Sequence, residues 1–176
     1  HSRITFKFDT AHPVGCTHHQ KIAVLDNQVA VCGGIDMTDQ RWDTREHKED
    51  DPRRKTPHGR PYKPWHDAAM MMEGEIAVAL AQLGDDRWTC AGGDELPDVP
   101  ESPGTPWPDA LEAQFENVEI GIARTRASYR DWDAVDEIEQ LYLKQIGAAK
   151  RFIYAESQYF ASRAIAEAII ARLQED

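Results

Sequence analysis

The stretch HHQKIAVLDNQVAVCGGID, residues 18–36, predicts the folded element around which the rest of the chain is arranged. Its residues 22–25 and 29–32 are short apolar runs with β-branched side chains, and residues 26–28, Asp-Asn-Gln, are turn formers. Two β-prone runs joined by so short a polar segment are typical of a β-hairpin. We therefore expect a rigid hairpin that carries the polar residues at its beginning.

The polar residues of this stretch suit phosphoryl chemistry. Side chains alternate between the two faces of a strand, so His19 and Lys21 are expected on one face, whereas His18 has the opposite parity and a structural or supporting role. Imidazole can attack phosphorus or relay a proton, and an ammonium group holds phosphate oxygens. Gly33 and Gly34 then allow the backbone to approach a ligand closely.

The spacing of His19, Lys21 and Asp26, H-x-K-x-x-x-x-D, resembles the signature motif of the phospholipase D superfamily. Further blocks extend this resemblance from about residue 2 to the C-terminal residue. Those similar to the first half of two-motif phospholipases D are GGIDMT at 33–38, RWD at 41–43 and PWHD at 64–67. The segment IYAESQYF at 153–160 resembles the one that opens the second half. An ordered series of blocks is far more specific than a lone H-x-K.

This resemblance implies a mechanism with two histidines. In the family, one motif histidine attacks phosphorus and forms a phosphohistidine, and the other protonates the leaving alcohol. By position, His19 resembles the nucleophile, and Lys21 would bind phosphate oxygens and stabilise the transition state. Asp26 belongs to the motif, and at the end of the strand we expect it to fix local structure. No metal or organic cofactor is required.

A catalytic imidazole also needs a carboxylate that sets its tautomer. Asp67 is our preferred partner of His19, because in the family an acidic residue near this point pairs with a motif histidine. Asp43 and Glu156 stay open as alternatives. Gly34 and Asp36 are expected to line the phosphate pocket, although Asp36 stands where many relatives have asparagine.

Composition narrows the class of protein. The 176 residues include 41% hydrophobic and 29% charged residues, which is an ordinary globular balance. The net charge of −11 disfavours broad nucleic-acid binding and general adsorption to anionic membranes. No apolar run approaches the roughly 20 residues of a membrane helix, so we expect a soluble chain with at most transient contact with a membrane surface; the compartment is not predicted. Three widely spaced cysteines suggest neither disulfides nor a metal site.

Two long loops are expected. Residues 44–64 are polar and irregular, and from 45 to 63 they carry seven Lys/Arg against four Asp/Glu. This local positive surplus suggests a basic rim for a phosphate-bearing substrate, and a plain solvated loop is the alternative. The second loop, near 92–108, is rich in proline and glycine and excludes regular structure.

The remaining pattern predicts an α/β fold, a mixed β-sheet sandwiched by helices. Further strands are expected at residues 3–9, 68–73, 118–124 and 152–155, the second and fourth of them buried. Helices are expected at 75–83, with an extension to residue 88 left open, at 134–149 after an Asp133 cap, and after a Ser162 cap. Their predicted inward-facing residues are Ile138, Leu141, Tyr142, Ile146, Ile165, Ile169, Ile170 and Leu173.

The second H-x-K motif of the family is absent from this sequence. We therefore interpret residues 1–150 as a first phospholipase D-like catalytic half and residues 151–176 as the start of a second half. A fragment of a two-motif enzyme is the favoured explanation, and a single-motif protein that dimerises is the alternative. Either way, the expected partner is a missing second half or a second copy of the chain.

The resulting functional hypothesis is a phospholipase D-type phosphodiesterase that hydrolyses glycerophospholipids or transfers their phosphatidyl group, although these residues alone are expected to be inactive. A cardiolipin synthase-like phosphatidyltransferase shares the chemistry and is the nearest alternative. A nuclease of the same superfamily is disfavoured by the acidity of the chain. A catalytically dead phospholipase-like scaffold is disfavoured because His19 and Lys21 are both present.

Overall fold

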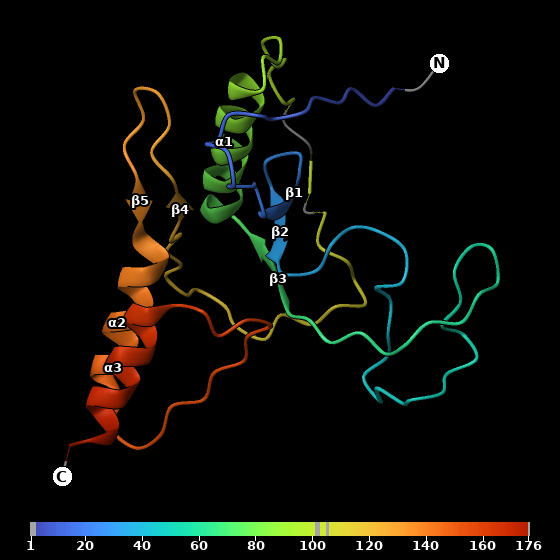
Figure 1. Cartoon of the computed structure of the whole chain (residues 1–176). Coiled ribbons are helices and arrows are strands. Elements are labelled where there is room, and N and C mark those ends of the chain that lie inside the picture. Colours follow the sequence, from blue (N-terminus) through green and yellow to red (C-terminus); the bar gives the residue numbers. More distant parts are fainter. Residues whose placement is uncertain (1–2, 101–102, 105, 176) are drawn as a thin grey trace. The chain divides into compact units, whose positions relative to one another are not determined.

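A computed structural model describes residues 3–100, 103–104 and 106–175. The chain forms two compact units (Figure 1). The first contains the described residues of His1–Ala11 and Thr17–Ile120, and the second contains those of His12–Cys16 and Gly121–Asp176. Each unit is described by itself below.

The first unit is built on a three-stranded antiparallel sheet in the order β1-β2-β3. Its strands are β1 (Lys21–Leu25), β2 (Val29–Gly33) and β3 (Ala69–Glu73). The predicted hairpin is confirmed, because Leu25 pairs with Val29 and Lys21 pairs with Gly33. In the turn, Asp26 and Asn27 adopt φ of 51° and 55°, a left-handed conformation that Asp and Asn tolerate better than most residues.

Helix α1 (Glu75–Cys90) packs against all three strands (Figure 1). The core between them is small and is formed by Ala30, Met72, Ala77 and Leu80, with Ile22 and Val24 among the partly buried residues around it. The helix is longer than the predicted 75–83 and includes the extension to residue 88 that was left open. Gly84 weakens a helix by only about 1 kcal/mol, which is not enough to end it before Cys90.

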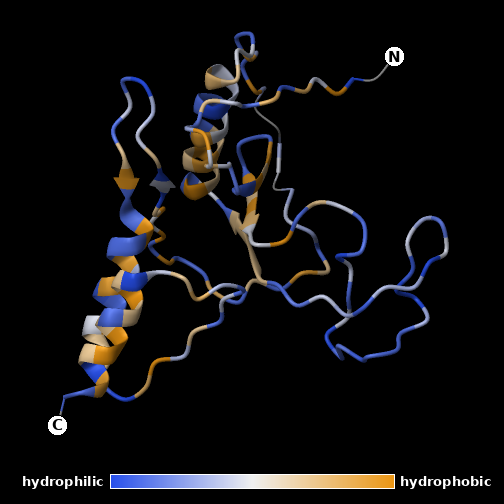
Figure 2. Ribbon diagram, viewed as in Figure 1, coloured by the Kyte–Doolittle hydropathy of each residue, from blue (hydrophilic) through white to orange (hydrophobic). Residues whose placement is uncertain are grey.

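Both long loops were predicted correctly. Residues 44–64 contain only turns and one isolated bridge, between Lys55 and Pro61, and they are predominantly hydrophilic (Figure 2). The described part of the Pro-rich loop, 92–100, 103–104 and 106–108, has no helix or strand. Residues 101, 102 and 105 of that loop lie outside the described residues.

The second unit holds two short antiparallel strands, β4 (Thr125–Arg126) and β5 (Val135–Asp136), and two helices that pack together, α2 (Glu137–Ala148) and α3 (Arg163–Leu173). The predicted Ser162 cap of α3 is confirmed, since its hydroxyl accepts a hydrogen bond from Ile165 N at 3.4 Å.

The predicted start of α2 at residue 134 was wrong, and so was its Asp133 cap. Val135 pairs with Arg126 in the β4–β5 ladder, so the helix cannot begin before Glu137. The predicted inward faces are only partly buried. Ile146 is buried, whereas exposed side chains include Leu141, Tyr142, Ile170 and Leu173.

Three predicted strands, at residues 3–9, 118–124 and 152–155, are irregular in the structure. Their apolar side chains stand exposed, such as Phe8 at 77% and Phe152 at 81%. Alternating or apolar runs indicate that a segment suits a sheet, but a strand needs a neighbour that supplies hydrogen bonds. Among the described residues, none of these segments joins a strand ladder. Strand β3 formed as predicted but is not buried throughout: only Met72 is buried, and Met70 is 63% exposed at the sheet edge.

The fold class is thus α/β, with small antiparallel sheets and three helices within the described residues. None of the helices in that part of the chain is both long and apolar enough to cross a bilayer.

Candidate active site

One end of the three-stranded sheet gathers most of the predicted site residues. Lys21 at the start of β1 pairs with Gly33 at the end of β2, which pairs with Ala69 at the start of β3. Just beyond, Gly34 N donates to Ala68 O at 3.0 Å and continues the ladder for one more bond. This end of the sheet, which we call the open end, lies opposite the hairpin turn.

Asp26 is not part of this gathering. It lies in the turn at the far end of β1, and the rise of about 3.3 Å per residue puts some 13 Å between the Cα atoms of Lys21 and Leu25. Its φ of 51° shows what it does there, because the turn needs a residue that accepts the left-handed conformation.

Lys21 is held firmly at the open end. Its side chain is only 12% exposed, and Nζ lies 3.0 Å from Asp36 Oδ1. Nζ also donates to the backbone carbonyl of His19 at 3.0 Å. The hydrogen bond from Lys21 lowers the pKa of Asp36, and Arg41, 3.4 Å from Oδ2, lowers it further. Asp36 is therefore ionised at neutral pH and bridges two cations.

His19 lies just before β1 and is exposed. Within the described part of the chain, its imidazole makes no hydrogen bond or ion pair, and it is available to an incoming group. Its neighbour His18 is less exposed and lies near a carboxylate, with Nε2 3.2 Å from Asp9 Oδ2. The supporting role predicted for His18 agrees with this contact.

Gly34 and Asp67 lie against each other. A Cβ added to Gly34 would collide with the Asp67 carboxylate, so a larger residue here would have to displace that side chain. Asp67 Oδ1 accepts a hydrogen bond from Ala68 N at 2.8 Å, which fixes the carboxylate beside the β2–β3 ladder. That Asp67 orients His19 stays a prediction.

Asp43, one of the alternative carboxylates, is the centre of a buried network. Its side chain is 7% exposed and accepts hydrogen bonds from Arg54 at 2.7 Å, Thr44 N at 2.8 Å and Trp65 N at 3.1 Å. His47 Nδ1 lies 2.8 Å from the same carboxylate. Burial raises the pKa of Asp43, but these hydrogen bonds and the Arg54 charge lower it to about 2.

Arg41 joins the open end to this network. Its guanidinium lies 3.9 Å from the centre of the Trp65 ring and 3.4 Å from Asp36 Oδ2. A cation over an indole face is attracted by the ring quadrupole. Sequence reasoning gave no role to Arg41 and counted Arg54, which is 1% exposed, only as part of the basic surplus of residues 45–63. The only available signal for Arg41 was its position in the RWD block.

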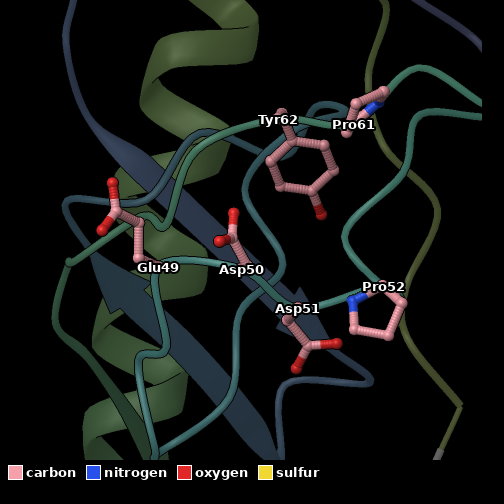
Figure 3. Close-up of a pocket in the computed structure, with 6 residues that line it drawn as sticks. All are labelled: Glu49, Asp50, Asp51, Pro52, Pro61 and Tyr62. Atoms are coloured by element: carbon pink, nitrogen blue, oxygen red, sulfur yellow. The ribbon is translucent and has the colours of Figure 1, made fainter.

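The basic surplus of residues 45–63 is partly neutralised. Arg53 pairs with Asp51 at 2.6 Å, and Arg54 pairs with Asp43. A shallow hollow of about 270 Å³ in this loop is lined by acidic residues and by none of the predicted site residues. Figure 3 shows its lining residues Glu49, Asp50, Asp51, Pro52, Pro61 and Tyr62.

Glu156, the other alternative carboxylate, belongs to the second unit. It accepts a hydrogen bond from the hydroxyl of Tyr154, and this bond raises the pKa of Tyr154. Both side chains are exposed. No group of three or more His, Cys, Asp or Glu side chains suited to a metal ion occurs among the residues that the structure describes.

Comparison with known proteins gives a consistent result. A family model described as phospholipase D matches residues 4–166. Phospholipase D alpha 1 of Zea mays is 31% identical in an alignment that covers 82% of this chain and 24% of that protein. The Vigna unguiculata protein of the same name is 32% identical with the same coverage, and that of Arabidopsis thaliana is 29% identical over 91% of this chain. The chain spans about a quarter of the length of these relatives.

Proposed function

This chain belongs to the phospholipase D family, and from that premise we propose that it supplies one catalytic half of a phosphodiesterase acting on glycerophospholipids. The observation that carries the proposal is the arrangement at the open end of the sheet. An exposed His19 lies two residues before Lys21, whose ammonium group is held by Asp36 at 3.0 Å and by the His19 carbonyl at 3.0 Å. A nucleophile and an adjacent fixed cation are what attack on a phosphodiester requires.

In the proposed reaction, a nitrogen of His19 attacks phosphorus while the bond from phosphorus to the head-group oxygen breaks. The electron pair leaves with that oxygen, which takes a proton from a general acid of a second motif. The same second-motif group, now deprotonated, takes a proton from water as the water oxygen attacks the phosphohistidine. The phosphorus–nitrogen bond breaks, and phosphatidate leaves with both His19 and the general acid regenerated. Lys21 is proposed to hold a phosphate oxygen in both steps. This is supported by the two contacts that orient its ammonium group, with Asp36 and with the His19 carbonyl.

Gly34, Asp36 and Asp67 complete the proposed site. Gly34 lets the backbone approach a phosphate, Asp36 holds Lys21, and Asp67 is the proposed partner that orients His19. Asp26 contributes by shaping the hairpin turn.

The second motif is proposed to come from a second catalytic half or from a second copy of the chain. We place the boundary between the two halves near residue 150, and we propose that a mixed sheet sandwiched by helices is completed when both halves are present. The substrate would be a phospholipid reached by transient contact with a membrane surface.

The test is His19→Ala in the full protein that contains this chain, with His58→Ala, an exposed loop histidine, as the matched control. Phosphatidate release from phosphatidylcholine is measured, with glycerol added to detect transfer as phosphatidylglycerol. We expect His19→Ala to lose several powers of ten in kcat and His58→Ala to match the wild type. Turnover of His19→Ala within about tenfold of the wild type would exclude His19 as the nucleophile.

A further inference from the structure

Arg87, in the last turn of α1, reaches back to the segment that precedes β1. Its Nε lies 2.7 Å from Asp9 Oδ2, and its Nη1 donates a hydrogen bond to Gln20 Oε1. Asp9 is 10% exposed, and its other oxygen accepts from Ala11 N at 2.9 Å. The Asp9 oxygen that binds Arg87 also lies 3.2 Å from His18 Nε2. One guanidinium is thereby connected to two residues, His18 through Asp9 and Gln20 directly.

These two residues are the neighbours of His19 on either side. Residues 18–20 lead directly into β1, and contacts on both sides of His19 restrict its backbone. The carbonyl of His19 is held too, by the ammonium group of Lys21 at 3.0 Å. The imidazole itself is exposed.

We propose that Arg87 and Asp9 form a positioning unit for His19 that transmits the rigidity of α1 to the nucleophile. This inference rests on the proposed function, in which His19 attacks phosphorus. Because helix α1 packs against all three strands, the backbone of Arg87 is held in place relative to the sheet. Arg87 does not contact His19, and it acts only through His18 and Gln20.

Loss of this unit should reduce turnover without reducing substrate binding. A displacement of about 1 Å at a reacting group can cost about 10²-fold in rate. We expect Arg87→Ala to lower kcat by about ten- to a hundredfold with KM nearly unchanged, because Arg87 contacts Asp9 and Gln20 rather than the residues proposed to bind phosphate. Arg163→Ala, which removes an exposed pair with Glu167, is the matched control and should leave both constants unchanged.

Two further measurements separate positioning from a general loss of stability. Gln20→Ala should lower kcat less than Arg87→Ala does. The change in activation free energy of the double variant should be smaller than the sum of the two single changes, because both substitutions remove the same contact. Hydrogen exchange at the amides of residues 17–20 should become faster in Arg87→Ala and stay unchanged in Arg163→Ala.

The outcomes distinguish this inference from the function on which it rests. A wild-type protein without phosphodiesterase turnover would overturn the proposed function, and exchange at residues 17–20 would then decide whether Arg87 holds this segment. An active wild type with unchanged kcat and unchanged exchange in Arg87→Ala would overturn the positioning unit alone. Should Arg87→Ala fail to fold, Gln20→Ala decides: wild-type kcat and wild-type exchange in that variant would reject the inference.

Discussion

Asp43 connects separate parts of the long polar loop, residues 44–64, through its carboxylate. Its buried carboxylate binds Arg54 in the middle of that loop and Trp65 N at the end of it. Because Trp65 also supports Arg41, the same carboxylate indirectly steadies the cations at the open end of the sheet.

The lowered pKa of Asp43 gives a prediction about acid stability. The pKa of Asp43 is about 2 in the folded state and about 3.9 for an aspartate in the unfolded state. Between these pH values the folded state therefore binds fewer protons than the unfolded state. The stabilising contribution is fully present above about pH 4 and is lost as the pH falls through about 2. We expect Asp43→Asn to be less stable at neutral pH and to have a weaker dependence on pH in this window. Acid unfolding followed by tryptophan fluorescence measures both effects.

Asp39→Asn, at an exposed carboxylate, is the control and should keep the wild-type dependence on pH. The same slope between about pH 4 and 2 in Asp43→Asn as in the wild type would contradict the role of Asp43.

Strand β2 is packed so closely against β3 that one of its residues must be glycine. A Cβ on Gly33 would lie 2.5 Å from Ala68 O and from Ala69 Cα, which are backbone atoms that cannot move without disturbing the ladder. We expect Gly33→Ala to lower the free energy of unfolding by about 1–3 kcal/mol, as overpacked sites do. Denaturant titration provides the measurement.

Gly84→Ala in α1 is the matched control, because a Cβ there meets nothing within 4 Å. Alanine is the better helix former, so this variant should gain about 0.5–1 kcal/mol in the free energy of unfolding. Equal stability of Gly33→Ala and the wild type would show that β2 and β3 separate more easily than the ladder implies.

For the whole molecule, the central prediction is that these 176 residues alone do not turn over a phospholipid. The leaving alkoxide needs a proton, and general acid catalysis is worth about 10²–10⁴-fold. The sequence has one H-x-K, at His19 and Lys21, and the only other imidazole placed beside it along the chain, His18, lies against Asp9.

Sedimentation of the purified chain measures its oligomeric state, and a phosphatidate assay on the same sample measures its turnover. We expect a monomer to be inactive and activity, if present, to increase with the fraction of dimer. Robust turnover by a strict monomer would overturn the mechanism with two motif histidines.

The sequence by itself determined the hairpin, the position of the polar residues at its beginning and the two irregular loops. These features depend on local chemistry: β-branched runs on either side of Asp26 and Asn27, and a loop whose prolines cannot join a ladder. The family also followed from the sequence, because ordered motif blocks can be compared without coordinates.

Only the tertiary structure decided which segments became strands and which charged side chains formed ion pairs. Residues 3–9 and 118–124 have strand-like patterns but join no ladder in the described part of the chain, and the pairing of Val135 with Arg126 delayed the start of α2. The contacts of Arg87 with Asp9 and Gln20 join residues 78 and 67 positions apart, a distance at which no periodicity in the sequence carries information. Propensity acts between neighbours in the chain, whereas sheet pairing and ion pairs depend on which distant segments fold against each other.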